Sequence, residues 1–428
     1  MTETRTGGRV LVSVGACIAG NLLLRAAGAA AISTIALFLA HIDRTLYPVP
    51  ATFLGVLAAT FYTTELLTAP VFGSLSDRFG RKPFMQLGGI FGAVAILALP
   101  LLPTIPLFVV ARLAEGLSSA SSIPSVLGHL ATATAGSAAF RGRVMAVFEV
   151  ATVLGFAGGA ALGGILWDSQ GPMAFYSICG IYLLSMLSFT LVQRVHHEHP
   201  HPQGRWLAVR ELLRNQAVVG FIPAWVSVNA ILGVWFSHLG FQMARQVDNP
   251  QLLVGGFTGT EVGLATGGVA LAFVVGTAAW AAVFGRIKTR TIMAIALQAI
   301  ACCAVLIYAL NHTPEDAVAR IWVFSGAIGI AVLVISGFTP AALAYLAELS
   351  EGFPQNRGGM MGLYSVLLGL GQLIGGWLGG FFAEAWAVDG LILLTMVLGL
   401  AANLSILAIS RSNGRPIAPS RDPGAAVV

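Results

Sequence analysis

The feature that most constrains this chain is a succession of apolar runs, each long enough to cross a lipid bilayer. A transmembrane helix needs about 20 predominantly apolar residues. Of the 428 residues 57% are hydrophobic and 10% are charged, whereas soluble domains carry about 25% charged residues. The sequence therefore predicts an all-α membrane protein with twelve transmembrane helices, near residues 11–40, 50–75, 84–103, 105–133, 142–166, 172–193, 217–243, 259–284, 290–310, 319–347, 357–384 and 390–410.

The basic residues predict the orientation of these helices. Eighteen Lys and Arg residues fall at one side of the predicted membrane, and three, Arg44, Arg245 and Arg320, fall at the other. Because cytoplasmic loops are enriched in Lys and Arg, we predict an integral multi-pass protein of a bacterial-type plasma membrane with both termini cytoplasmic. The net charge of +5 is spread over successive loops rather than one face, so nucleic-acid binding is not expected.

The longest polar interruption divides the chain into two halves. We predict an N-terminal six-helix bundle over 1–193, a cytoplasmic linker over 194–216 and a C-terminal six-helix bundle with a short cytoplasmic tail over 217–428. The linker contains four histidines, and a solvated linker explains them better than a metal site does. The four cysteines lie inside apolar runs, and no phosphate-binding G-x-x-x-x-G-K-[ST] motif is present. We expect no enzyme activity, no metal and no cofactor.

The two halves repeat each other at a shift of 216 residues. Arg141 and the four residues after it fall on Arg357 and its successors, and Pro124 falls on Pro340. Five residues of the fifth predicted helix match the eleventh in the same register, namely Gly155, Gly159, Leu162, Gly163 and Gly164 on Gly371, Gly375, Leu378, Gly379 and Gly380.

The loop between the second and third predicted helices reads Gly73-Ser-Leu-Ser-Asp-Arg-Phe-Gly-Arg-Lys82. Its glycines permit a tight reversal, and its basic residues suit a cytoplasmic loop. An ordinary loop of this kind does not explain Asp77. The stretch resembles the G-x-L-(a)-D-R-x-G-R-(K)-x loop of the major facilitator superfamily. The resemblance implies two parallel bundles with the substrate between them, and conformational gating by Gly73, Asp77, Arg78, Gly80 and Arg81.

Two further motifs resemble that family. Arg112-Leu-Ala-Glu-Gly116 resembles its R-x-x-x-G pattern, which implies a part in proton coupling. The glycines from Gly155 to Gly164 resemble its antiporter motif G-x-x-x-G-P-x-x-G, although Ala160 replaces the proline and Ala146 replaces an earlier glycine. Glycines four apart also permit close helix packing without any directional meaning, so both interpretations stay open.

Ionisable residues at membrane depth are costly and are functional candidates. There are five, all in the first half, and we assign them to proton coupling, with buried structural ion pairs as the alternative: Arg25, Glu65, Arg112, Glu115 and Glu149. Arg112 lies one turn from Glu115 and would hold it ionised. Glu149 has no basic residue within a turn on its own helix, and its counterpart in the repeat is Ser365. Glu149 is therefore our first choice for the proton carrier, although His129 lies at a similar depth and offers a partner that would make it structural.

The remaining polar and aromatic positions inside the helices are uncharged and suit an amphipathic substrate better than a sugar. We predict that they line a substrate cavity: Tyr62, Phe148, Asn229, Trp235, His238, Tyr345, Tyr364 and Gln372.

Together these features predict a proton-coupled secondary transporter that exports a small amphipathic or drug-like solute by alternating access. Its expected partners are a small-molecule substrate, protons and the lipid bilayer, and we expect a monomer. Three alternatives remain: an organic-anion carrier in which Arg25 and Arg112 bind the anion, a lysolipid carrier, and a non-transporting membrane sensor.

Overall fold

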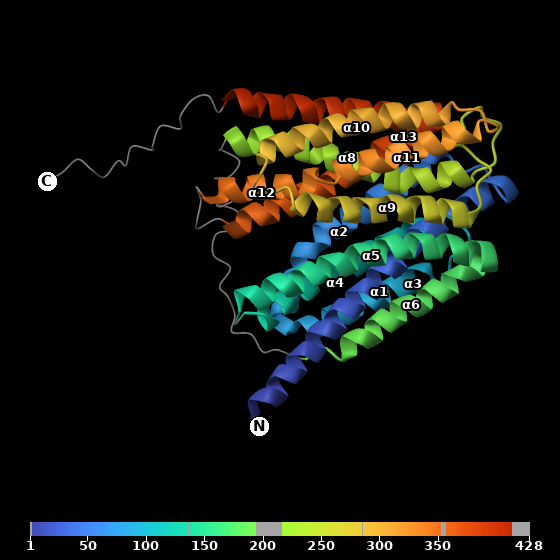
Figure 1. Ribbon diagram of the computed structural model, residues 1–428. Helices are drawn as coiled ribbons and strands as arrows, with labels where there is room; N and C mark the ends of the chain where they lie inside the picture. Colours follow the sequence, from blue (N-terminus) through green and yellow to red (C-terminus); the bar gives the residue numbers. More distant parts are fainter. Residues whose placement is uncertain (1, 136, 194–215, 285, 352–356, 413–428) are drawn as a thin grey trace.

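The structure, a computed structural model, describes residues 2–135, 137–193, 216–284, 286–351 and 357–412. Figure 1 shows helices that run side by side and are joined by loops at the two ends of the molecule. No β-strand occurs among the described residues, apart from one isolated bridge between Phe284 and Ile287. The first half contains α1 (Thr2–Thr45), α2 (Ala51–Phe79), α3 (Arg81–Leu97), α4 (Ile105–Ala133), α5 (Ala138–Gln170), the 3₁₀ turn η1 (Gly171–Met173) and α6 (Ala174–Thr190). The second contains α8 (Gln216–Ala244), α9 (Gly259–Ala281), α10 (Thr289–Asn311), α11 (Val318–Ile335), α12 (Phe338–Glu351) and α13 (Arg357–Ser412).

All twelve predicted crossings are present, which confirms the predicted fold class. Three of them differ from the prediction, because one is broken into two helices and two are joined into one helix. The predicted crossing 319–347 is broken into α11 and α12 at Ser336 and Gly337. The indole Nε1 of Trp280 lies 3.2 Å from the carbonyl oxygens of Leu333 and Val334 and satisfies them where the helix stops. The last two predicted crossings both lie in α13, which bends sharply at Trp386 and Ala387.

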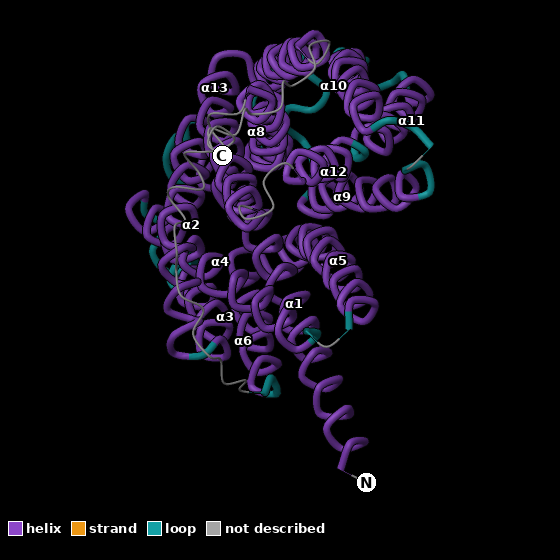
Figure 2. Tube along the Cα trace, turned by 90° about the vertical axis from the view of Figure 1, so that its left-hand side faces the viewer, coloured by secondary structure: helices purple, strands orange, loops and turns teal. Residues whose placement is uncertain are grey.

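The helices form two bundles, α1–α6 and α8–α13, which Figure 2 shows as two groups viewed along the helices. The glycines of the repeat make equivalent contacts in each bundle. A Cβ atom added to Gly159 would meet the backbone of Ala26 in α1, and one added to Gly375 would meet the backbone of Ala230 in α8. Close approach of backbones explains why glycine stands at both positions. The structure thus gives the sequence repeat the same packing role in both bundles. The predicted linker lies outside the described residues, except for its last residue.

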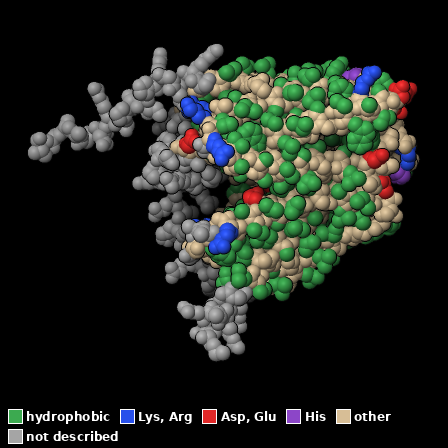
Figure 3. Space-filling view, in the orientation of Figure 1, with side chains coloured by type: hydrophobic (Ala, Val, Ile, Leu, Met, Phe, Trp, Pro, Cys, Tyr) green, Lys and Arg blue, Asp and Glu red, His purple; other side chains and the backbone are tan. Residues whose placement is uncertain are grey.

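The outer surface suits a lipid environment. Eight stretches of the described residues are long and apolar enough to cross a membrane, and two of them, Phe140–Thr190 and Ser365–Ile409, run through two crossings each. Figure 3 shows a flank covered mostly by hydrophobic side chains, with most of the visible charged groups near the two ends. These features match the predicted integral multi-pass membrane protein.

The two bundles touch closely in their predicted extracellular halves. In α2, a Cβ on Gly55 would meet the backbone of Gly376 and of Gly380 in α13. In α5, a Cβ on Gly164 would meet Gly259 and Gly263 of α9. Beside these contacts, Arg245 Nη2 lies 3.6 Å from Asp43 Oδ2 across the same interface. All of these contacts lie toward the predicted extracellular face, so the two bundles are closed together there.

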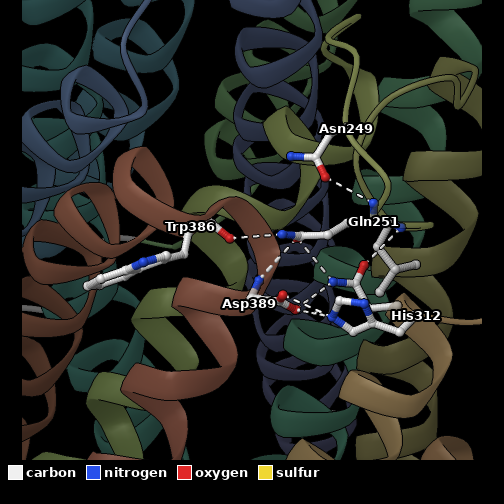
Figure 4. A network of polar contacts seen from close by, with 7 residues as sticks. Asn249, Gln251, His312, Trp386 and Asp389 are labelled. Atoms are coloured by element: carbon white, nitrogen blue, oxygen red, sulfur yellow. Dashed lines mark hydrogen bonds and ion pairs between the residues drawn. The ribbon is translucent and has the colours of Figure 1, made fainter.

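A polar network stiffens the same face within the second bundle (Figure 4). Gln251, in the loop between α8 and α9, donates from Nε2 to the carbonyl oxygen of Trp386 and accepts through Oε1 from the Asp389 N–H. Asp389 also accepts from Asn311 at 2.9 Å, and its Oδ2 lies 2.9 Å from His312 Nε2. The network therefore connects the α8–α9 loop, the end of α10 and the bend in α13.

Candidate functional site

Six ionisable or phenolic side chains from four helices of the first bundle form one group, which we call the polar cluster: Arg25, Tyr62, Glu65, Arg112, Glu115 and Glu149. Its members come from α1, α2, α4 and α5. The five predicted proton-coupling residues are thus assembled together with one residue predicted to line the cavity. With every carboxylate ionised, two arginines and three glutamates give this cluster a net charge of −1.

Arg112 and Glu115 form a buried ion pair one turn apart on α4, with Nη1 donating to Oε2. Their side chains are only 8% and 3% exposed. The guanidinium also lies 4.6 Å from the centre of the Phe61 ring in α2, a favourable cation–π contact. Both partners of Arg112 therefore belong to its own bundle, and the pairing with Glu115 is the one that the spacing of three residues predicted.

Glu65 is held differently, although it lies nearby on α2. Its Oε1 accepts a hydrogen bond of 2.6 Å from Ser119 Oγ in α4. Its charged neighbours are Arg25 and Arg112, and it also interacts electrostatically with Tyr62. The carboxylate thus has both a hydrogen-bond donor and positive charges around it.

Glu149 is the exposed acid of the cluster, and Arg25 is its charged neighbour. Arg25 interacts electrostatically with both Glu65 and Glu149, so two carboxylates share this guanidinium as a charged neighbour. Its Nε is buried and has no hydrogen-bond acceptor among the described residues. His129, the alternative partner predicted for Glu149, places Nε2 3.0 Å from Ser13 Oγ in α1.

The sequence prediction missed three neighbours of the cluster: Phe61, Ser119 and Tyr182. Tyr182 of α6 is buried and interacts electrostatically with Glu115, Arg112 and Arg25. A signal was available for two of them. Ser119 follows Glu115 by four residues and Phe61 precedes Glu65 by four, so each shares a helix face with a cluster member. Nothing in the sequence distinguishes Tyr182 from other aromatic residues within the helices.

The other predicted cavity positions lie in varied surroundings. Phe148 is buried in an apolar core of the first bundle, and Tyr345 is buried against Phe221 in the second. Both rings are buried, which differs from the predicted lining of an open cavity: apolar neighbours surround Phe148, and the Arg290 guanidinium also lies 5.3 Å from the centre of the Tyr345 ring. Trp235 donates from Nε1 to Thr395 Oγ1 at 3.0 Å.

The polar positions of α8 and α13 are held mainly by backbone groups. Asn229 donates to the Trp225 carbonyl at 2.9 Å, and the Nε2 of His238 lies 2.7 Å from the Gly376 carbonyl oxygen. Gln372 is half-buried. The side chain of Tyr364 lies outside the described residues.

The residues predicted to gate the conformational change lie at the predicted cytoplasmic end of α2 and at the start of α3. Gly80 has φ +94°, a conformation that favours glycine, and separates α2 from α3. Asp77 Oδ1 accepts from Arg81 Nη2 at 3.0 Å, and Arg81 also donates to Thr132 Oγ1 in α4 at 2.7 Å. The guanidinium of Arg78 lies over the Phe79 ring. Asp77 is therefore paired within its own bundle here.

The other predicted loop glycine, Gly73, has more room. A Cβ added there would make only ordinary contact with Pro124 of α4. Its glycine identity is thus not explained by crowding in this conformation. No group of three or more potential metal ligands occurs among the described residues.

Comparison with known proteins gives one family for both halves of the chain. The family model described as Major Facilitator Superfamily matches residues 17–257 and 250–427. Multidrug resistance protein 1 of Bacillus subtilis is 24% identical over 337 residues, which cover 76% of this chain and 80% of that protein. The class C tetracycline resistance protein of Escherichia coli is 31% identical over 220 residues, covering 47% of this chain and 53% of that protein.

A solved structure supports the same fold. The nucleoside transporter NupG superposes with a TM-score of 0.75 at 11% sequence identity, and the match covers 94% of this chain and 99% of that one. At this identity the likeness concerns the arrangement of the helices alone.

Proposed function

Because the chain belongs to the major facilitator superfamily, we propose that it is a proton-coupled transporter that exports a small amphipathic or drug-like solute by alternating access. As a member of this superfamily it is a transporter of small molecules and not an enzyme. The proton coupling, the direction of transport and the substrate class are the proposed parts.

The observation that carries the proposal is the composition of the polar cluster, in which two arginines face three glutamates and Arg25 interacts electrostatically with both Glu65 and Glu149. Two guanidinium groups cannot neutralise three carboxylates, so a proton or a cationic substrate completes the charge balance of the cluster. When a cationic solute takes that place, the proton is released, and when the solute leaves, the proton returns. Such competition for one carboxylate couples export of the solute to entry of the proton.

The pairing of the arginines disfavours the organic-anion alternative. Arg112 is bound by Glu115, and Arg25 faces two carboxylates. An anionic substrate would have to displace a carboxylate from one of them, and the cluster with its net charge of −1 would repel it. The multidrug and tetracycline resistance proteins among the relatives support the export of drug-like solutes.

The test uses the purified protein in liposomes with an imposed pH gradient. We expect lipophilic cations to accumulate against their concentration gradient and to move protons in the opposite direction, as read from a pH-sensitive dye. Empty liposomes and liposomes without a pH gradient serve as controls. Transport of organic anions alone, or cation transport that is indifferent to the pH gradient, would contradict the proposal.

A further inference from the structure

Two carboxylates cross the interface between the bundles at the predicted extracellular face. Asp168, near the end of α5, accepts from the backbone N–H of Gly259 at 2.8 Å and from that of Thr260 at 2.6 Å. Both N–H groups belong to the first turn of α9. Glu384 of α13 accepts in the same way from the N–H of Ala51, the first residue of α2. Each bundle thus supplies an acid that caps a helix of the other.

The internal repeat relates these two contacts. A shift of 216 residues places Asp168 on Glu384, the same register that places Gly164 on Gly380. Each acid follows its glycine by four residues, so it lies one turn beyond the point where the two backbones touch. The same contact is therefore built twice, once from each half of the sequence repeat.

The capped helix ends depend on these acids to different degrees. The first N–H groups of any helix lack partners within the helix. α2 begins after Pro50, which provides no side-chain acceptor, so Glu384 from the other bundle supplies the acceptor for Ala51. α9 also has its own capping box between Thr258 and Glu261, and Asp168 adds acceptors for two further N–H groups.

Both contacts are anchored rigidly within the second bundle. The loop that leads into α9 is held by the Leu252 N–H on the Asn311 carbonyl at 2.7 Å and by the Gly255 N–H on the Gln242 carbonyl at 2.9 Å. The bend that follows Glu384 is held by Gln251, which bonds the Trp386 carbonyl and the Asp389 N–H. Neither the loop before α9 nor the bend after Glu384 can therefore move with the first bundle when the two bundles separate at this face. Both caps must break for the face to open.

We propose that Asp168 and Glu384 are a paired extracellular gate that holds the bundles closed at this face, and that both caps release when the protein opens to the outside. The inference rests on the alternating access proposed above. When the bundles separate, water replaces each carboxylate at the helix end, so the caps stabilise the closed state specifically.

The test measures the separation of the bundles directly. Cys17, Cys179, Cys302 and Cys303 are first replaced by serine. Spin labels are then placed at Leu102→Cys and Val318→Cys, exposed positions at this face in the first and second bundle. Loss of one helix cap weakens a helix end by about fivefold in an equilibrium constant. We therefore expect Asp168→Ala and Glu384→Ala each to raise the ratio of long to short distances about fivefold, and the double variant to raise it by roughly 25-fold because distant contacts add.

Glu261→Gln is the matched control, because this acid caps the same end of α9 but only within its own bundle. It should leave the distances unchanged. If the double alanine variant gives the same distance distribution as the labelled parent, or if Glu261→Gln opens the face equally, the gate is excluded. The distances can be measured without any substrate, so a protein that transports nothing in the liposome assay would still report on the gate.

A second measurement keeps the proposal testable if the alanine variants fail to fold. Asp168→Cys combined with Thr260→Cys places two thiols where the cap now lies. We expect a short bifunctional thiol reagent to join them in the resting protein and to suppress the long distances completely, with reversal by a reductant when the linker is cleavable. Long distances that persist in the cross-linked protein would overturn the proposal.

Discussion

Among the acids of the polar cluster, Glu149 is the exposed one, and its charged neighbour is Arg25. Glu115 is locked in a buried ion pair, and Glu65 is held by Ser119. A proton carrier must release its proton in at least one state, which favours Glu149, the most accessible of the three acids, over the other two. We expect Glu149→Gln, which mimics the protonated form, to keep substrate binding and exchange while losing accumulation driven by a pH gradient.

The measurement compares counterflow with uphill uptake in the same liposomes. Glu261→Gln, an acid outside the cluster, serves as a control and should retain both. If Glu149→Gln still concentrates solute against its gradient, the proton carrier is a different residue, and Glu65 is the next candidate.

Arg112 and Glu115 show a different consequence of burial. Removing one partner of a buried ion pair leaves the other charge without compensation, which costs about 3–5 kcal/mol. We expect Arg112→Gln to lower the thermal unfolding midpoint of the detergent-solubilised protein strongly. The double variant Arg112→Gln with Glu115→Gln should recover most of the loss, because the buried carboxylate that Arg112 neutralised is removed together with it. Arg44→Gln, at an exposed position, should have little effect, and a double variant as unstable as the single one would refute a pairing role.

At the scale of helices, the glycines of α5 from Gly155 to Gly164 fall into two kinds. Some are required by close packing against another helix, and others only belong to the glycine-rich sequence pattern. A Cβ on Gly159 would meet the backbone of Ala26, which cannot yield as a flexible side chain does, whereas a Cβ on the adjacent Gly158 would meet nothing within 4 Å. We expect Gly159→Ala to destabilise the protein by about 2 kcal/mol. Gly158→Ala should be neutral, or stabilising by up to about 1 kcal/mol through its higher helix propensity. Chemical unfolding of the two variants checks this, and equal effects would show that these glycines do not set the α1–α5 distance.

The sequence predicted most of the helices and the repeat because apolar length and glycine spacing are local signals. Gly375 in α13 could be assigned a packing role from its match with Gly159. The break at Gly337 could not be predicted, since it depends on an indole that arrives from α9. Asp168 and Glu384 lie at helix ends, where acids are common, so their contacts became apparent only when the bundles were seen together.

At the scale of the molecule, the bundles are closed at the predicted extracellular face, and Asp77 is paired with Arg81 inside its own bundle. The sequence could not predict this closure, because under alternating access the same residues must support both a conformation closed at this face and one open at it. We expect Asp77→Asn to abolish transport while the protein stays folded, because the lost pair is half-exposed and contributes at most about 1 kcal/mol. The expected reason is the predicted gating role, in which Asp77 helps to close the cytoplasmic face in the other conformation. Asp316→Asn in an exposed loop is the control, and unchanged flux in Asp77→Asn would remove this role.

The composition of α4 has a consequence for how the protein is made. This helix carries Arg112, Glu115 and several serines, and it is not among the stretches apolar enough to cross a membrane by composition alone. A charged segment enters the bilayer reluctantly from the translocon. Arg112 is neutralised by Glu115, and its Nε lies 3.5 Å from the Leu57 carbonyl oxygen in α2, a helix synthesised earlier. Insertion of α4 should therefore depend on α2 remaining beside the translocon, so that α2, α3 and α4 enter the membrane together during synthesis.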